Sequence, residues 1–304
     1  FGKFILDGDD SNKALEYLCT NKVNKNKKTT YTMMCNEAGT IECDITVSKI
    51  DENKYYINTG GSFTNYTNFW INKNLKKYNF NCKLEDISEK YGVLSINGRN
   101  SKKLLEEILK DSLDLNFGNN KYLNINDINL FIIRMSYVGE LGYELHIPSE
   151  KCLELYKIIM QFGKKYNIMN AGYGCLETLS MEKGYKHFHS DISTKDTPIE
   201  AGLNFICKKK TNFIGKDIID QQRKLGVYRK LICLSLNEKI ALYGNETIFR
   251  NNIPVGFIKR AGFSYSTNKP IAFGYIEDTT NNNYITDTFL EDGNYTLDVL
   301  GKKY

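Results

Sequence analysis

The sequence IECDITVS, residues 41–48, alternates apolar and polar side chains along its whole length. Successive side chains of a β-strand point to opposite faces, so this pattern predicts a strand that is buried on one face only. The apolar face would hold the odd-numbered residues from Ile41 to Val47, which places Asp44 on the polar face. This alternation alone favours a solvated aspartate, although a polar strand face can equally line a ligand cavity.

Strand and helix patterns alternate on both sides of this segment. Strand patterns cover residues 54–59, 130–137 and 143–147, and helical spacing covers residues 101–110, 151–165 and 172–186. The turn-rich segment 191–202 is expected to lead into a strand. This mixture predicts an α+β architecture for roughly the first two thirds of the chain.

The pattern changes near residue 230. From there short strand patterns follow one another, several are separated by turn signals, and no helical periodicity is evident. We therefore expect residues 1–225 to form an α+β region of two intertwined subdomains, and residues 226–304 to form an all-β, barrel-like domain.

Composition narrows the classes of function. The 304 residues carry a net charge of +5 from 41 basic and 36 acidic side chains, and only six of the basic residues are arginine. This balance argues against a nucleic-acid partner, and no apolar run is long enough to predict a membrane span. The eight cysteines show no metal-ligand spacing, so no metal site is expected, and unpaired cysteines favour a reducing compartment.

Two local patterns combine glycine with charged residues. RMSYVGELGYE, residues 134–144, has glycines three apart, and spacing alone favours a tight hairpin over a site. Residues 171–184 come close to a dinucleotide fingerprint, but Glu177 stands at the third glycine position and excludes it. In the same helix Glu182 falls on an apolar face, where either an internal salt bridge or a functional role would explain it.

Five segments together resemble the folate-binding aminomethyltransferase family, which includes the T-protein of the glycine cleavage system. They are residues 36–44, 137–144, the helix that carries Glu182, 197–202 (TPIEAG) and 213–216 (FIGK). The chain is most similar to the carboxy-terminal half of sarcosine and dimethylglycine dehydrogenases. That closer similarity lies in residues 1–4 (FGKF), 182–189 (EKGYKHFH) and 274–276 (GYI).

The resemblance implies a cloverleaf of three domains around a folate pocket, with the all-β domain at the C-terminus. It implies that Asp44 is the catalytic residue beside the reactive nitrogens of tetrahydrofolate. It also implies that Glu182 binds the pterin head, whose edge offers two adjacent N–H donors to a carboxylate. The other cofactor-binding positions that it implies are Tyr31, Asn58, Gly60, Tyr137 and, for the glutamate tail of the folate, Lys208 and Lys210.

The function implied is a tetrahydrofolate-dependent one-carbon transfer that yields 5,10-methylenetetrahydrofolate and an amine. The expected partner is the lipoyl-bearing H-protein, and the expected location is the mitochondrion. One alternative is the folate-binding portion of a sarcosine dehydrogenase-like protein, although no FAD site is expected in this chain. A third is a non-catalytic regulatory protein on the same fold. The amine donor does not follow from the sequence.

Overall fold

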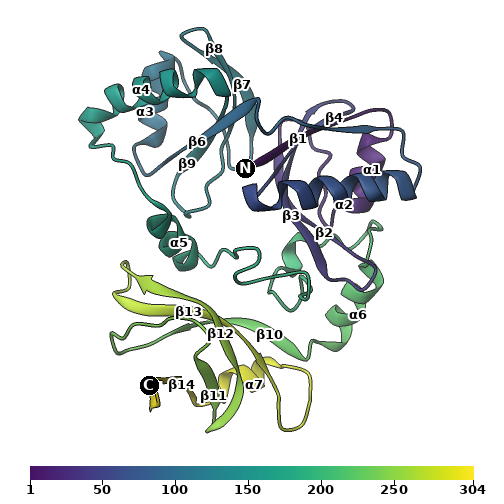
Figure 1. The fold of residues 1–304 in the computed structure, drawn as a ribbon, viewed down its shortest axis with the longest axis vertical. Helices are drawn as coiled ribbons and strands as arrows, with labels where there is room; N and C mark the ends of the chain where they lie inside the picture. The colour runs from purple at the N-terminus through teal and green to yellow at the C-terminus, as the bar shows by residue number, and fades with distance from the viewer. The chain divides into compact units, whose positions relative to one another are not determined.

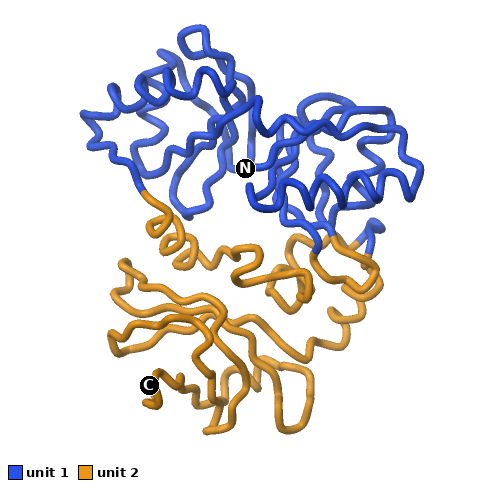
Figure 2. Tube along the Cα trace, viewed as in Figure 1, with its two compact units in different colours: residues 1–34, 42–171, 210–214 blue, residues 35–41, 172–209, 215–304 orange.

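A computed structural model describes residues 1–304 (Figure 1). The chain forms two compact units, each built from segments that lie far apart in the sequence (Figure 2). Unit 1 contains residues 1–34, 42–171 and 210–214, and unit 2 contains residues 35–41, 172–209 and 215–304. No helix in either unit has the length and apolar character needed to cross a membrane.

The first sheet of unit 1 has the strand order β2-β3-β4-β1-β5. Its strands are β1 (Gly2–Asp7), β2 (Thr29–Cys35), β3 (Ile41–Asp51), β4 (Lys54–Thr59) and β5 (Lys83–Asp86). Apolar residues of β1, β3 and β4 pack with helices α1 (Ser11–Leu18) and α2 (Thr64–Lys77) in one core. A short 3-10 helix, η1 (Gly61–Phe63), precedes α2.

The second sheet of unit 1 has the order β6-β9-β8-β7. Its strands are β6 (Tyr91–Asn97), β7 (Asn120–Ile125), β8 (Ile128–Ile133) and β9 (Gly142–Pro148). Helices α3 (Ser101–Leu109) and α4 (Cys152–Gly163) share a core with one face of this sheet. The 3-10 helices η2 (Ser149–Lys151) and η3 (Lys164–Tyr166) flank α4.

The two sheets of unit 1 meet through the faces that do not carry helices. Tyr56 of β4 packs its ring 5.4 Å from that of Phe131 on β8 and 5.2 Å from that of His146 on β9, measured between ring centroids. Tyr56, Phe131 and Ile133 belong to one buried cluster. We call the side chains on these facing strand faces, including those that continue the faces beyond the cluster, the inter-sheet layer.

Unit 2 is built on an antiparallel sheet of order β10-β13-β12-β11-β14-β15. Its strands are β10 (Arg229–Ser235), β11 (Thr247–Arg250), β12 (Ile253–Ser264), β13 (Lys269–Glu277), β14 (Tyr295–Val299) and β15 (Lys302–Lys303). Its helices are α5 (Tyr173–Glu182), α6 (Lys216–Leu225), α7 (Asp287–Glu291) and the 3-10 helix η4 (Asn204–Ile206). Helix α5 contacts β12 and β13.

Most of the expected elements are present. The strand over residues 41–48 is confirmed as β3, and the helix over residues 101–110 is confirmed as α3. The expected strand after segment 191–202 is wrong, because Leu203 N–H donates to the Pro198 carbonyl and the chain continues into η4. The C-terminal region also contains one short helix, α7, that shows no periodicity because it has only five residues.

The structural units divide the chain differently from the sequence domains expected at 1–225 and 226–304. Helix α5 and residues 215–225 group with the C-terminal sheet. The short segment 35–41 also belongs to unit 2, whereas the rest of β3 belongs to unit 1.

Candidate functional site

Asp44 lies on β3, and its carboxylate accepts a hydrogen bond from the hydroxyl of Tyr31 on β2. Burial raises the pKa of Asp44 to about 7, although the hydrogen bond from Tyr31 works in the opposite direction. Burial and the nearby Asp44 carboxylate raise the pKa of Tyr31 well above its ordinary value, so Tyr31 remains the donor. A carboxyl group that titrates near neutral pH can accept and release a proton under physiological conditions.

The strand register places other polar side chains on the same face as Asp44. Thr46 of β3 lies opposite Asn58 of β4, and Asn58 lies opposite Lys3 of β1. Asn58 Nδ2 donates to Thr46 Oγ1 over 3.3 Å, but Asn58 Oδ1 is buried without a hydrogen bond. An unpaired buried acceptor costs roughly 1–3 kcal/mol, so this oxygen is a candidate to accept a hydrogen bond from a ligand.

Tyr137 and Gly60 lie at the edge of this region. Tyr137 belongs to the loop between β8 and β9, and it is close enough to Tyr31 to contribute to the raised pKa of that residue. Gly60 directly follows β4, and its carbonyl accepts a hydrogen bond from the Phe63 amide over 2.9 Å. The structure therefore brings Tyr31, Asp44 and Tyr137 together, with Gly60 at the end of a neighbouring strand.

Glu144 of β9 lies in the same inter-sheet layer, and neither the sequence patterns nor the family resemblance indicated it as a site residue. It is opposite Ile133, a member of the buried cluster between the sheets, and two residues from His146. Its side chain is 15% exposed, and its nearest charged or ionisable partner is His146, with 3.6 Å between Oε2 and Nε2. The alternation in GYELHIP could have identified it, because two ionisable residues share one face of an otherwise apolar strand.

Glu182 belongs to unit 2 and is the last residue of α5. Its carboxylate accepts hydrogen bonds from the Ser266 amide over 3.2 Å and from the Ser266 hydroxyl over 2.6 Å. Burial acts to raise the pKa of Glu182, but the hydrogen bonds from Ser266 outweigh it and hold the pKa below its ordinary value. The carboxylate keeps unused lone pairs, so these bonds do not exclude a ligand.

The two lysines assigned to the folate tail lie close together in the sequence but differ in environment. Lys208 is buried within unit 2, whereas Lys210 is exposed and belongs to unit 1. Both follow η4 on an irregular segment. Their proposed contact with a folate tail stays a prediction.

Two buried aspartates of unit 2 are fully paired. Asp191 is completely buried and accepts hydrogen bonds from Arg260 Nε and Nη2 over 3.0 and 2.6 Å, and from the His187 amide. Asp196 accepts hydrogen bonds from the amide and hydroxyl of Ser193 and forms an ion pair with Arg229. These pairs account for the charges without a ligand.

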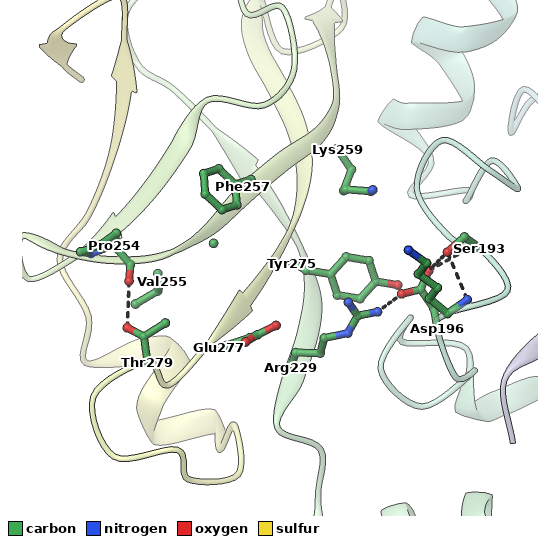
Figure 3. Close-up of a pocket in the computed structure, with 12 residues that line it drawn as sticks. Ser193, Asp196, Arg229, Pro254, Val255, Phe257, Lys259, Tyr275, Glu277 and Thr279 are labelled. Atoms are coloured by element: carbon green, nitrogen blue, oxygen red, sulfur yellow. Dashed lines mark hydrogen bonds and ion pairs between the residues drawn. The ribbon is translucent and has the colours of Figure 1, made fainter. Parts of the chain in front are cut away.

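Unit 2 also contains a cavity of about 510 Å³ between the 193–196 loop and strands β10, β12 and β13. Figure 3 shows that Arg229 and Ser193 both reach Asp196 in its wall. The Arg229 guanidinium also stacks on the Tyr275 ring, 4.3 Å from its centroid. None of the site residues expected from the sequence lines this cavity, and Asp196 in its wall is paired with Arg229.

Models of known protein families match both the N-terminal and the C-terminal part of the chain. Residues 1–211 match the GCVT N-terminal domain, and residues 229–304 match the glycine cleavage T-protein C-terminal barrel domain. The chain belongs to the glycine cleavage T-protein family. The resemblance found in the sequence is therefore confirmed.

Individual relatives fall into two groups. Mouse (Mus musculus) mitochondrial sarcosine dehydrogenase is 38% identical over 100% of this chain but only 35% of its own length. The aminomethyltransferase of Halothermothrix orenii is 30% identical over 90% of this chain and 77% of its own length. The chain thus spans about a third of the sarcosine dehydrogenase that it matches and most of the aminomethyltransferase.

A solved structure supports the fold. The glycine cleavage system aminomethyltransferase T from Bartonella henselae matches with a TM-score of 0.85 and 19% identity, over 99% of this chain and 81% of its own. The expected fold class, α+β with a C-terminal all-β domain, is confirmed.

Proposed function

We propose that this chain transfers a one-carbon unit from an aminomethyl donor to tetrahydrofolate, giving 5,10-methylenetetrahydrofolate and an amine. The observation that carries the proposal is the inter-sheet layer of unit 1. There Asp44, with a pKa of about 7, lies on the same sheet face as an unpaired buried acceptor, Asn58 Oδ1. The match to the T-protein family and to an aminomethyltransferase supports this reaction.

The side chains of this layer fit a reduced pterin. A pterin edge presents N–H donors, and the layer offers acceptors in Asn58 Oδ1 and in the carboxylates of Asp44 and Glu144. The contact of Glu144 with His146, at 3.6 Å, is longer than a hydrogen bond, so the carboxylate has lone pairs available for two N–H donors. Glu182, the carboxylate expected from the sequence, would have to share its oxygens with Ser266.

In the proposed reaction, Asp44 transfers protons and the other residues of the layer bind and orient the folate. Tetrahydrofolate would supply the nitrogen nucleophile that takes up the one-carbon unit. Two carbon–nitrogen bonds form in the reaction, one to each of two folate nitrogens, while the bonds from the transferred carbon to the amine and to the sulfur of its carrier break. Asp44 accepts the proton that leaves the first nitrogen, and the two protons released by the folate nitrogens end on the departing amine and the departing thiolate. Tyr31 donates to Asp44 and stabilises its charged form, while the surrounding layer holds the reacting atoms together and limits water.

The donor and its carrier are part of the proposal. With a T-protein-like function, the donor is an aminomethyl group on the lipoyl arm of H-protein, and the working compartment is the mitochondrion. Relatives whose names place them in mitochondria support the second point. Lys208 and Lys210 are proposed to meet the glutamate tail of the folate.

A second function is favoured by the lengths of the relatives. The chain matches about a third of sarcosine dehydrogenase. In that setting it would be a folate-binding module that captures formaldehyde equivalents released by another part of a longer protein. Transfer from aminomethylated H-protein supports the first function. Folate-dependent trapping of formaldehyde without transfer from H-protein supports the second. A regulatory protein would do neither.

Calorimetry with tetrahydrofolate, followed by a transfer assay, tests the proposal directly. We expect wild-type binding, and we expect Glu144→Gln to weaken it about tenfold or more, because a charged hydrogen bond contributes roughly 1.5–3 kcal/mol. Exposed Glu140 lies in the loop just before β9, so Glu140→Gln is the matched control and should leave affinity unchanged.

The parallel pair of variants on α5 decides between the two carboxylates. Glu182→Gln is compared with Glu177→Gln, which changes an exposed carboxylate of the same helix. A large loss with Glu182→Gln and none with Glu144→Gln would assign the pterin head to Glu182, as the family resemblance implies. No folate binding by the folded wild-type chain would overturn the proposed function.

A further inference from the structure

The cavity of unit 2 has an apolar end and a polar end. Pro254, Val255 and Phe257 of β12 lie at the apolar end, and Ser193 and Asp196 belong to the loop at the polar end (Figure 3). All of the lining residues belong to unit 2, so the cavity is complete within one compact unit. Its volume of about 510 Å³ is in the range of pockets that hold small organic molecules.

Phe257 leaves a large aromatic surface uncovered at the apolar end. Its side chain is 58% exposed, although it lies in the wall of a cavity. The strand register places Phe257 directly opposite Tyr275, so the two aromatic side chains lie on the same face of the sheet. The Arg229 guanidinium stacks on the Tyr275 ring, which leaves Phe257 as the ring that is open to a partner. A flat apolar group in the cavity can stack on it.

Three cationic side chains line the cavity, and two of them lack a partner. Arg229 forms an ion pair with Asp196, whereas Lys195 and Lys259 are exposed and form no ion pair. Figure 3 shows the Lys259 ammonium directed toward the loop that carries Lys195. The remaining charge in the lining is the exposed carboxylate of Glu277. Two free positive charges and one negative charge leave the cavity with a net charge of plus one, which is complementary to a monoanion.

The Tyr275 hydroxyl is a further donor in the cavity wall. Tyr275 is 7% exposed, and its hydroxyl is buried without a hydrogen bond. Burial raises the pKa of Tyr275 well above its ordinary value, so the hydroxyl stays protonated. Figure 3 shows this hydroxyl directed toward the polar end of the cavity. An anionic group bound there can accept its hydrogen bond and recover the cost of burying an unpaired donor.

We propose that this cavity binds an organic monoanion with a flat apolar body, of the aryl carboxylate class. The carboxylate of the ligand lies between Lys195 and Lys259 and accepts a hydrogen bond from Tyr275, while its ring stacks on Phe257. A phosphate monoester fits less well, because it carries a second negative charge that the lining does not balance. The site does not depend on the folate chemistry proposed for unit 1, so either proposal can fail without the other.

Three probes that share one ring system test the ligand class. Calorimetry on the full chain compares 2-naphthoate, 2-naphthyl phosphate and the neutral 2-naphthol. We expect 2-naphthoate to bind at a single site, more tightly than the other two probes, and to bind more weakly as the salt concentration rises. Equal or tighter binding of 2-naphthol would show that the lysines take no part. Tighter binding of the phosphate would overturn the assignment to a monoanion.

Charge variants locate the anion. Lys195→Gln and Lys259→Gln should each weaken 2-naphthoate binding about twofold to fivefold and leave 2-naphthol binding unchanged. Glu277→Gln should act in the opposite direction and strengthen 2-naphthoate binding by a similar factor, because it removes a repulsive charge. Lys239→Gln is the matched control, since Lys239 is exposed in the same unit but does not line the cavity. Lysine losses no larger than that of the control, or weaker binding in Glu277→Gln, would contradict the proposal.

The aromatic contact has its own variant. Phe257→Ala should weaken all three probes about twofold to tenfold, because they share the ring that stacks on Phe257. Leu300→Ala is the control, because Leu300 is a 93% exposed apolar residue of the same unit outside the cavity. Both side chains are exposed, so both variants should fold, and far-ultraviolet circular dichroism checks this. Unchanged affinity in Phe257→Ala, or no binding of 2-naphthoate by the folded wild type, would overturn the proposal.

Discussion

Unit 1 and unit 2 differ in how their buried polar groups are paired. In the inter-sheet layer of unit 1, Asn58 Oδ1 and His146 Nε2 lack hydrogen bonds, and Asp44 has a pKa of about 7. In unit 2 the buried carboxylates are paired, Asp191 with Arg260 and Asp196 with Arg229 and Ser193. The polar groups of this layer in unit 1 are left unsatisfied, whereas unit 2 pairs its buried carboxylates internally, although His187 Nδ1 and the Tyr275 hydroxyl there lack hydrogen bonds.

The difference separates groups that stabilise the fold from groups that can serve a ligand. A paired buried charge is best explained by the fold, because losing its partner would leave it unsolvated. An unsatisfied buried group is a cost to the fold, and a ligand that satisfies it recovers that cost on binding. Applied to the buried carboxylates, this criterion assigns the proposed proton transfer to Asp44 of unit 1 and makes the Asp191–Arg260 pair structural.

The strongest test of this contrast is Asp44→Asn. The amide keeps the size of the side chain but cannot take up a proton, so we expect the transfer rate to fall about 10²–10⁴-fold. Folate affinity should change far less, because the other acceptors of the layer remain. Single-turnover transfer and calorimetric binding, measured on the same sample, separate the two effects.

Asp51→Asn is the matched control for this substitution, because Asp51 is the exposed last residue of the same strand. It should leave both the rate and the affinity unchanged. Full transfer activity in Asp44→Asn would show that Asp44 is not the proton acceptor. It would contradict the functional assignment of unit 1 without affecting the fold assignment.

The second test concerns the structural side of the contrast. Arg260→Met leaves the Asp191 carboxylate fully buried without its cation, so we expect a loss of about 3–5 kcal/mol in the free energy of unfolding. The double variant with Asp191→Asn should recover part of this loss, because no lone charge remains. Urea denaturation measures both.

Arg99→Met provides the baseline, since Arg99 is exposed, and it should change stability by less than about 0.5 kcal/mol. If Arg260→Met were as mild as this control, the paired carboxylates of unit 2 would not be structural and the criterion would fail.

The sequence predicted what depends on near neighbours. The alternation over residues 41–48 was enough to place Asp44 on the polar face of β3, because the period of a strand is a local property. The helical stripe that became α3 is local in the same sense. The resemblance of several segments to one family predicted the fold and identified the site segments. No single motif was sufficient for this.

Contacts between distant segments could not be read from these patterns. The polar face of β3 lies in a layer rather than in open water because a second sheet, formed by residues 91–148, packs nearby. Glu182 was expected either to form a salt bridge or to bind a ligand. It accepts hydrogen bonds from Ser266, which lies 84 residues further along the chain, and its ligand role stays a prediction. Glu182 was expected to bind the pterin head because of the family resemblance alone. Glu144 becomes a candidate because the strand register places it in the inter-sheet layer.

The smallest expected effect is the decrease in the free energy of unfolding caused by burying the Asp44 carboxylate in the inter-sheet layer. In the native state Asp44 has a pKa of about 7, against an ordinary value of 3.8 expected for the unfolded chain. Between these values the native state binds more protons than the unfolded state, so this residue lowers stability as pH rises from about 4 to 7. Above pH 7 the penalty is complete, and below the unfolded pKa it vanishes.

Asp44→Asn removes this titration. Relative to the wild type, the variant should therefore gain about 1–3 kcal/mol in unfolding free energy between pH 4 and pH 8, allowing for the partial exposure of the side chain. Urea midpoints at several pH values measure the difference, and Asp51→Asn should run parallel to the wild type throughout. A pH-independent difference for Asp44→Asn would mean that Asp44 titrates as an ordinary surface carboxylate. The inter-sheet layer would then cost the fold no more than the paired charges of unit 2, and the same residue would be too acidic to serve as the proton acceptor near neutral pH.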